Sequence, residues 1–523
     1  MKFNKEAREG LILGANKLVD AIKVTLGAKG RHVAYQDALY RVYLTKDGAT
    51  VGKHVIPTNP IENMGANIVR EASEKTAKEA GDGTSTSSVL AQAIINEGFK
   101  YLEAGHNPIL LKKGMEMALE DVRKYLADST VLINDNTELL KQVASVSANG
   151  DRELGELIVD TLLTVGEYGV VKIEESNTSE TYADITQGLE FDRGLMSPYF
   201  VTNPERQDTE MDDPLILLYD GKLSNFQALS PLMEKVNSAS RNVLVIAEDI
   251  DMDCLQNIVA NRVRSTLKIA TVKAPSFADN KTEILEDIAI LTDTKVYNSL
   301  SFSQLCEAEL EDLGNCERII SGRNNTVIIG GIGQGVDERI ETIKARLDNP
   351  EDEDNYDSLK ERLAKLTGGV AVIYVGGNSK VEQGEKKDRV EDAVLASKAA
   401  LDEGVVVGGG TALVRALEYV KSSEDEVLNA GINIIRKALE KPLFYIAENG
   451  GAKGDIVVEK VKESKGNTGY NVFTDTYEDL FKQGVVDPKK VTRVALENAV
   501  SVAGMLLTTE CAIPYKPFKI EEF

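Results

Sequence analysis

The sequence predicts a multi-domain protein of mixed α and α/β class, in which two helical ends fold together around an α/β middle. A chain of 523 residues is too long for one hydrophobic core and suggests about three domains. Apolar residues recur at helical spacing through residues 5–127 and again beyond residue 403. Between residues 187 and 366, apolar runs alternate with helix-period segments, which is typical of an α/β domain.

The charge balance is strongly acidic. There are 84 acidic and 60 basic residues, which gives a formal charge of −24. This excess opposes sequence-independent binding to nucleic acid or to anionic membranes, so neither is an expected partner. The N-terminus lacks a signal-peptide core, and no apolar run reaches transmembrane length. Four scattered cysteines and three histidines without ligand spacing predict a reduced, cytoplasmic protein without a structural transition metal.

The first region is expected to be nearly all helical. An apolar face within residues 5–24 predicts one amphipathic helix. A Gly-punctuated basic loop at residues 25–31 follows it, and β-rich runs at residues 32–35 and 41–44 come next. The Asp-Gly pair at residues 47–48 has a hairpin turn as its simplest interpretation.

The segment Gly-Asp-Gly-Thr-Ser-Thr at residues 81–86 is the one around which function is predicted. Its glycines allow positive φ and a close ligand approach. An apolar helical pattern follows, so the loop leads into a helix N-terminus, with Thr84, Ser85 and Thr86 as candidate caps. Free N–H groups and the helix dipole favour an anion there. Asp82 would repel a phosphate unless a divalent cation lay between them. The alternative is an ordinary turn and cap.

The middle region predicts strands and helices in alternation. Strands are expected at residues 215–218, 243–246, 269–272, 326–329 and 370–375, and helices at 338–347, 358–366 and 389–403. The glycine-rich segment 330–336 follows a strand and precedes a helix. A dinucleotide site is nevertheless rejected there, because Val336 occupies the position that requires glycine.

Short motifs occur along the chain in the order that one family carries them. They are Thr25-Leu26-Gly27-x-Lys29-Gly30-Arg31, Thr45-Lys46-Asp47-Gly48, Glu62-Asn63-Met64-Gly65-Ala66, Gly81-Asp82-Gly83-Thr84, Phe191-Asp192-Arg193-Gly194, Arg389-Val390-Glu391-Asp392-Ala393, Gly408-Gly409-Gly410, Gly469-Tyr470-Asn471 and Thr508-Thr509-Glu510-Cys511. Each motif is weak alone, but the ordered series is specific. The chain resembles the group I chaperonins, the GroEL-type folding machines, over almost its whole length.

The resemblance implies a chaperonin fold with three domains. A helical equatorial domain would comprise residues 1–129 and 403–523. A small α/β intermediate domain would comprise residues 130–186 and 371–402, and an α/β apical domain residues 187–370. The implied assembly is a homo-oligomeric seven-fold ring.

The resemblance also implies an ATP site with Mg²⁺, and K⁺ as a further candidate cation. Asp392 would orient the attacking water, Asp47 would be a second carboxylate beside the γ-phosphate, and Asp82 would hold Mg²⁺. The nucleotide-binding positions are Thr25, Leu26, Gly27, Ala28, Lys46, Asp82, Gly83, Thr84, Ser85, Thr86, Gly409, Asn471, Val472, Phe473 and Asp487. For Asp392 the alternative is a solvated helix carboxylate.

Unfolded client proteins are the implied partners, with a co-chaperonin lid as a further candidate. The matching apolar positions are Leu195, Tyr199, Phe200, Met233, Leu255, Val259 and Ala260. The alternative is that these side chains are simply core. Tyr199, Phe200, Leu255 and Val259 are expected to form an exposed patch.

Several positions depart from the family pattern. Ala28 replaces a proline, Ser230 a leucine and Lys380 a glutamate, and Phe444 and Lys453 stand where an arginine and a glutamate help to join two rings. The C-terminus lacks a Gly-Gly-Met tail. These departures suit an accessory or virus-encoded member, which would act in the host cytoplasm.

Two function hypotheses remain. The first is an ATP-driven folding chaperonin, which the retained Asp47, Asp82 and Asp392 favour. The second is a ring-forming holdase with little productive ATP turnover. A small-molecule kinase is disfavoured, because no second pocket can be identified from the sequence.

Overall fold

The computed structural model describes most of the chain. The described residues are 1–36, 40–133, 136–148, 150–166, 170–176, 178–186, 188–204, 206–264, 268–275, 280–298, 305–347 and 356–514. The tail at residues 515–523, where the family motif is missing, lies outside them. The chain divides into two compact units. The first contains Met1–Val159, Glu175–Thr181 and Val375–Phe523, and the second contains Asp160–Glu174 and Tyr182–Tyr374. The finer division into three domains stays a prediction.

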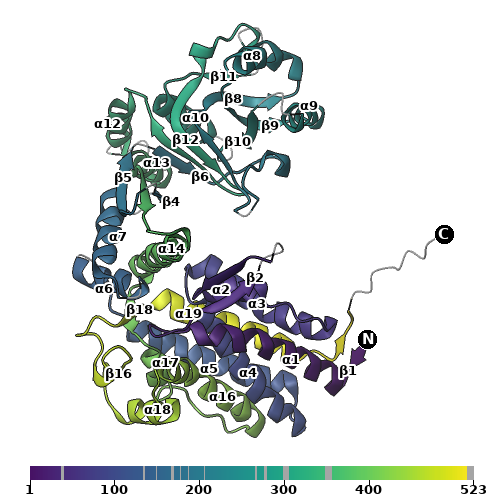
Figure 1. Cartoon of the computed structure of the whole chain (residues 1–523), viewed down its shortest axis with the longest axis vertical. Coiled ribbons are helices and arrows are strands. Elements are labelled where there is room, and N and C mark those ends of the chain that lie inside the picture. Colours follow the sequence, from purple (N-terminus) through teal and green to yellow (C-terminus); the bar gives the residue numbers. More distant parts are fainter. Residues whose placement is uncertain are drawn as a thin grey trace, which may run out of the picture. The chain divides into compact units, whose positions relative to one another are not determined.

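The first unit is mainly helical and is built from both ends of the chain (Figure 1). Its helices are α1 (Asn4–Ile22), the 3-10 helix η1 (Lys23–Thr25), α2 (Gly48–His54), α3 (Pro60–Ala80), α4 (Thr84–Glu103), α5 (Pro108–Asp128), α6 (Thr137–Ser147), α14 (Lys380–Glu403), α15 (Thr411–Ala416), α16 (Glu426–Leu439), α17 (Lys441–Asn449), α18 (Gly454–Glu463) and α19 (Lys489–Leu507). Its strands are β1 (Lys2–Phe3), β2 (Val33–Gln36), β3 (Val42–Thr45), β15 (Val405–Val407), β16 (Thr468–Asn471), β17 (Thr476–Asp479), β18 (Val486–Pro488) and β19 (Cys511–Ala512). Helix α7 (Arg152–Val165) continues into the second unit.

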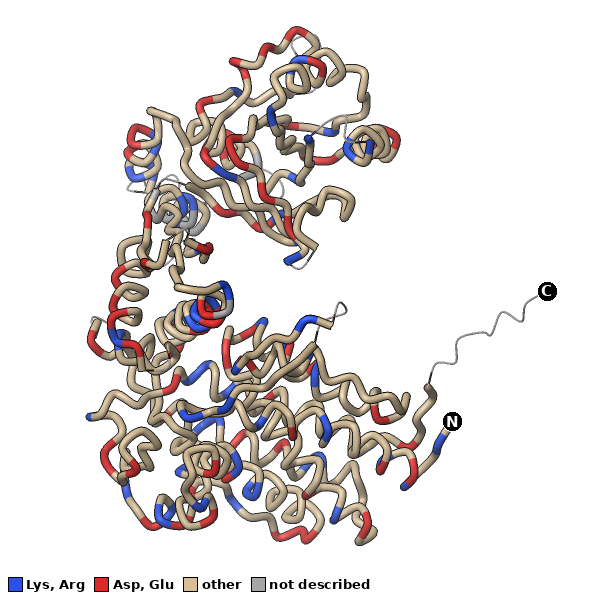
Figure 2. Tube along the Cα trace, in the orientation of Figure 1, with Lys and Arg blue, Asp and Glu red and all other residues tan. Residues whose placement is uncertain are grey.

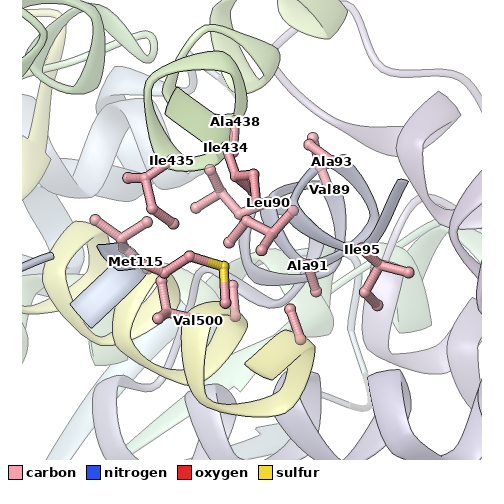
Figure 3. Close-up of a cluster of buried hydrophobic side chains, with 14 of the residues drawn as sticks. Val89, Leu90, Ala91, Ala93, Ile95, Met115, Ile434, Ile435, Ala438 and Val500 are labelled. Atoms are coloured by element: carbon pink, nitrogen blue, oxygen red, sulfur yellow. The ribbon is translucent and has the colours of Figure 1, made fainter. Parts of the chain in front are cut away.

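Helices from the two chain ends share one hydrophobic core. Helix α19 packs against α3 and α4, and α16 packs against α5. Leu90, Met115, Ile435 and Val500 bring side chains from α4, α5, α16 and α19 into this core (Figure 3). Strands β1 and β19 pair antiparallel. Burial of each large apolar side chain stabilises the fold by about 1.5–3 kcal/mol. The predicted joint folding of the two ends is therefore confirmed.

The second unit is an α/β domain around a mixed eight-stranded sheet. Strands β8, β9, β10 and β11 pair in parallel, whereas β6, β7, β12 and β13 pair antiparallel. A three-stranded sheet has the order β4-β14-β5. The strands are β4 (Val170–Glu175), β5 (Tyr182–Thr186), β6 (Gly188–Phe191), β7 (Thr209–Asp212), β8 (Leu215–Leu223), β9 (Val243–Ile250), β10 (Ile269–Lys273), β11 (Val296–Asn298), β12 (Gly314–Ser321), β13 (Thr326–Gly331) and β14 (Val370–Val375). The strand predictions at residues 215–218, 243–246, 269–272, 326–329 and 370–375 are confirmed.

Helices flank these sheets. They are η2 (Pro198–Phe200), α8 (Phe226–Ser238), α9 (Met252–Val263), α10 (Asn280–Thr292), η4 (Leu310–Asp312), α12 (Val336–Leu347) and α13 (Tyr356–Gly368). The glycine-rich segment after β13 packs tightly on α10. A Cβ at Gly331 or Gly333 would lie 2.5 Å from Leu291 or 1.7 Å from the Ile290 carbonyl oxygen. Close packing on α10 therefore explains these glycines without a dinucleotide.

Charged residues are interspersed along the chain of both units in Figure 2. This distribution agrees with the mixed acidic and basic composition and with an excess of 24 negative charges. Within the described residues, no helix combines the length and the apolar character needed to cross a membrane.

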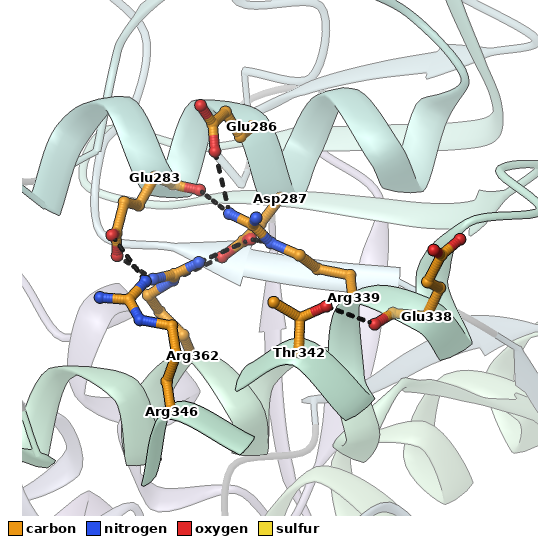
Figure 4. A network of polar contacts seen from close by, with 8 residues as sticks. All are labelled: Glu283, Glu286, Asp287, Glu338, Arg339, Thr342, Arg346 and Arg362. Atoms are coloured by element: carbon orange, nitrogen blue, oxygen red, sulfur yellow. Dashed lines mark hydrogen bonds and ion pairs between the residues drawn. The ribbon is translucent and has the colours of Figure 1, made fainter. Parts of the chain in front are cut away.

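A buried ion-pair network joins α10 to α12 and α13 (Figure 4). Arg362 and Arg339 each donate from Nε to Asp287 at 2.7 Å. The side chains of Arg362 and Asp287 are 3% and 2% exposed. Glu283 accepts from both Arg346 and Arg362. The three helices are thus joined by a network whose central pair, Arg362 and Asp287, has little access to water.

Asp287→Ala should strongly destabilise the second unit. Removal of one partner leaves buried arginine charges uncompensated, which costs about 3–5 kcal/mol. Chemical denaturation should show a lower midpoint for this unit. Glu286→Ala removes only a half-exposed partner of Arg339 and should cost less than about 1 kcal/mol. Equal midpoints for Asp287→Ala and the unaltered protein would contradict the role of the network.

Candidate functional site

The loop at residues 81–86 joins α3 to α4, as predicted. Gly81 ends α3 with φ of +80°, and Gly83 precedes α4 with φ of +88°. A side chain at Gly83 would also meet Val491, since its Cβ would lie 2.7 Å from that residue. Gly83 is the N-cap, and no side chain caps α4. The prediction that residues 84–86 supply the cap is therefore wrong, because they form the first helical turn.

The uncapped start of α4 has the features of an anion-binding site. An α-helix leaves its first N–H groups unpaired, and its dipole is positive at this end. Thr25 Oγ1 lies 3.3 Å from Ser85 Oγ, which brings the loop after α1 to the same place. A Cβ at Gly48 would lie 2.1 Å from Ser85 Oγ, so the segment before α2 arrives there too. Three segments distant in sequence therefore meet at one helix N-terminus.

Asp47 begins a helix and does not form a hairpin turn. Its carboxylate caps α2 by accepting from the N–H groups of Ala49 at 3.0 Å and Thr50 at 2.7 Å. The hairpin interpretation of this Asp-Gly pair is wrong, because β3 has already ended at Thr45 and the next element is α2. Lys46 precedes Asp47 and is half-buried.

Four carboxylates in the first unit influence one another. Burial and then the charges of Asp82 and Asp47 hold the pKa of Asp392 well above its ordinary value. Burial also raises the pKa of Asp82, against a hydrogen bond from the Gly83 N–H and with the help of the Asp47 charge. Burial and the charge of Asp82 raise the pKa of Asp487 to about 7. A nearby cation would stabilise the ionised form of each of these carboxylates.

Helix α14 brings Asp392 to this loop. A Cβ at Gly81 would lie 2.4 Å from Cβ of Leu395, which follows Asp392 by one turn, so α14 rests directly on the loop. The C-terminal end of α14 is anchored to α19 by the ion pair between Glu403 and Arg493, at 2.5 Å. The helix is also longer than the sequence indicated, since it begins at Lys380.

A divalent cation fits here only together with a phosphate. Among the described residues, no three Asp, Glu, His or Cys side chains converge closely enough to hold a metal. Mg²⁺ commonly takes one or two carboxylates and completes its shell with phosphate oxygens and water. Asp82, at the uncapped helix end, is suited to be the carboxylate ligand of such an ion.

The residues predicted around the base and ribose lie in or next to two strand pairs, β15–β18 and β16–β17. Asn471 ends β16 and Asp487 lies in β18, whereas Gly409 follows β15, and Val472 and Phe473 follow β16. Gly409 and Gly410 have φ of +64° and +75°, and their N–H groups donate to the Asp487 carboxylate. A Cβ at Gly409 would lie 3.8 Å from the carbonyl oxygen of Tyr470, at the end of β16. The two strand pairs therefore meet at Gly409.

Within the β16–β17 hairpin, the predicted residues differ in availability. Asn471 accepts from the Phe473 N–H at 3.0 Å and donates to Glu478 at 2.9 Å. Val472 is buried in a core cluster, whereas the Phe473 ring is exposed. Of these three side chains, only that of Phe473 is largely exposed. The base-binding roles of all three residues stay predictions.

The predicted client-binding residues of the second unit fall into three groups by exposure: exposed, buried and half-buried. Tyr199 is 67% exposed. Phe200 and Met233 are only 0% and 2% exposed. The prediction that they are surface positions is wrong, because both pack inside the core of this unit. The remaining positions are half-buried: Leu195, Leu255, Val259 and Ala260.

Sequence reasoning missed two exposed apolar residues on α9, Met252 and Val263. With Leu255 and Val259 they recur at steps of three and four, which places them along one side of the helix. Helix α9 also contacts η2, which carries Tyr199. The helical spacing alone could have indicated these two positions.

Together, the helical first unit, the α/β second unit and the convergent loops define a chaperonin subunit. The chain belongs to the TCP-1/cpn60 chaperonin family, whose model matches residues 18–517. Among solved structures it is similar to the chaperonin gp146 from the bacteriophage EL 2 (Pseudomonas aeruginosa), crystallised in the presence of ATP-BeFx. The TM-score is 0.66 at 20% identity, over 97% of this chain and 98% of that chain. The predicted family and fold are thereby confirmed.

Proposed function

We propose that this protein is an ATP-dependent chaperonin that captures unfolded proteins in a ring and promotes their folding. The observation that supports this most directly is the meeting of the α4 N-terminus, Asp82 and Asp392 within one unit. An uncapped helix end suits the phosphates of ATP. A carboxylate on α14 is suited to orient the attacking water.

The residues take distinct roles in this proposal. The loop at residues 25–28 and the first turn of α4 would hold the phosphates, with Lys46 nearby. Asp82 would hold Mg²⁺, which when bound neutralises phosphate charge, and K⁺ is a further candidate there. Asp47 would lie beside the γ-phosphate, and Asp392 would orient water.

Unfolded clients would bind the apolar side of α9 together with Tyr199. Extended apolar surface of this kind is rare on monomeric proteins and commonly marks an interaction site. A ring repeats the surface, so weak contacts in each subunit add up to useful affinity. A co-chaperonin lid remains a candidate partner for the same unit.

Steady-state ATPase measurements with and without an unfolded protein test this function. Turnover with Mg-ATP that responds to unfolded protein is the expected result. Capture of unfolded protein with negligible turnover would favour the holdase alternative instead. Absence of both ATP binding and capture would refute the proposal.

Stacking of two rings is expected to be weak. Phe444 stands where the family has an arginine, and its ring packs on Gly454, whose Cβ would lie 2.6 Å from it. Lys453 and Asp455, the sequence neighbours of Gly454, are exposed. An ion pair between rings is thus replaced by an aromatic group and a cation. Exposed pairs contribute only about 0–1 kcal/mol each, but they repeat around the ring.

Mass measurement at micromolar subunit concentration checks this prediction. The protein should form seven-subunit rings that stack weakly or only with some nucleotides. The double variant Phe444→Arg with Lys453→Glu should shift the population towards two stacked rings, because it restores the pair. A fourteen-subunit particle of the unaltered protein in every nucleotide state, at low and high salt, would contradict the prediction.

A further inference from the structure

A single side chain near the end of the sequence holds the loop that follows α1. Asn449, the last residue of α17, donates from Nδ2 to the carbonyl oxygens of Lys23 and Leu26, each at 2.9 Å. These partners are 426 and 423 residues away in the sequence. Both partners are acceptors, so the amide nitrogen must face them, and both of its N–H groups are used.

Other residues of α17 shape the same loop. A Cβ at Gly27 would lie 3.0 Å from Cγ1 of Ile446. Gly27 has φ of +83°, where glycine is favoured. The Lys23 ammonium lies 5.1 Å from the ring centre of Tyr445. Three residues of α17 therefore contact this loop: Asn449 by hydrogen bonds, Ile446 by close packing and Tyr445 by a cation–π interaction.

The hydrogen bond from Asn449 to the Leu26 carbonyl also fixes the direction of the next N–H group, that of Gly27. A trans peptide holds the carbonyl of one residue and the N–H of the next on opposite sides of a rigid plane. With the Leu26 carbonyl directed at Asn449, the Gly27 N–H points away from α17. Within the described residues, that N–H has no hydrogen-bond partner. The Gly27 N–H is therefore a donor of fixed orientation. It lies in the loop whose Thr25 side chain contacts Ser85, in the first turn of α4.

We infer that Asn449 is a positioning residue for the phosphates: by holding the Leu26 carbonyl, it presents the Gly27 N–H to a phosphate oxygen. This inference rests on the proposed binding of ATP. Asn449 itself touches no phosphate in this scheme. Its contribution is the orientation of a donor that would otherwise rotate with its peptide plane.

The inference predicts a selective loss of affinity. Asn449→Ala removes both N–H donors, and the near-isosteric Asn449→Asp removes them while keeping the side-chain shape. In each variant the full-length protein should bind Mg-ATP about ten- to a hundredfold more weakly, the factor expected for a hydrogen bond to a charged group. Adenosine has no phosphate, so its affinity should not change. KM for ATP should rise much more than kcat falls, because Asp392 is untouched.

Calorimetry with ATP and adenosine, together with steady-state kinetics, provides the test. Asn96→Ala is the matched control, since it removes a half-buried amide that pairs with Asn16 at 3.0 and 3.1 Å on another helix. This control should bind both ligands normally. Normal ATP affinity in both Asn449 variants, or equal losses for ATP and adenosine, would overturn the inference alone. An unaltered protein that binds no ATP would overturn the proposed function as well.

Discussion

Asp392→Ala should bind Mg-ATP with nearly normal affinity and hydrolyse it at least about a hundredfold more slowly. Orientation of the attacking water by a positioned carboxylate typically contributes about 10²–10⁴-fold to the rate. Asp392 lies on α14, which packs on the loop at residues 81–86, whereas the groups proposed to bind ATP lie on other segments. Binding and turnover should therefore separate in this variant. Calorimetry and single-turnover hydrolysis measure the two quantities.

Two further variants make this prediction specific. Asp82→Ala should instead weaken the binding of Mg-ATP itself, since it removes the proposed Mg²⁺ ligand. Asp402→Ala removes an exposed carboxylate from the same helix, paired with Lys490 at 2.7 Å, and should hydrolyse ATP normally. Unchanged turnover in Asp392→Ala would refute the catalytic role. Loss of ATP binding in that variant would show that its carboxylate acts in binding.

Tyr199→Glu should abolish capture of an unfolded protein while basal ATPase activity is retained. A carboxylate placed in the apolar surface must lose water to contact an apolar client segment, and burial of an unpaired charge is costly. Repetition around a ring multiplies that cost. Co-sedimentation or light scattering with a chemically unfolded protein measures capture, and the ATPase assay monitors the first unit.

Ile332→Glu is the matched control for this experiment. Ile332 is another exposed apolar residue of the second unit, on the segment after β13, and lies outside the proposed client surface. Its replacement should leave capture intact. Tyr199→Glu that captures clients normally would disprove the assignment of this surface. If Tyr199→Glu unfolded the second unit, Tyr199 would be a structural residue, contrary to its exposure.

Local patterns predicted the elements of this subunit well. Apolar patterns located α1 and the strands β8, β9, β10 and β13 within a few residues. The glycines at positions 81 and 83 were expected at positive φ, and both adopt it. These predictions depend on interactions among neighbouring residues, which the sequence displays directly.

Other predictions failed where a sequence pattern was compatible with two different structures. The Asp-Gly pair at residues 47–48 is compatible with a hairpin turn, yet Asp47 caps α2. Phe200 and Met233 belong to apolar patterns that suit either a surface or a core, and packing places both in the core. Periodicity defines an apolar face but not what covers it.

The sequence by itself determined the chaperonin class, the glycine-rich loop before α4 and the joint helical ends, because ordered motifs and periodic side chains are local properties. Only the tertiary structure decided which carboxylates repel one another and which side chain holds the loop after α1. Asp82 and Asp392 are distant in sequence, yet each other's charge matters because electrostatic interaction depends on separation in space. Asn449 likewise reaches Leu26 across 423 residues, and a hydrogen bond forms only when folding brings donor and acceptor to about 3 Å.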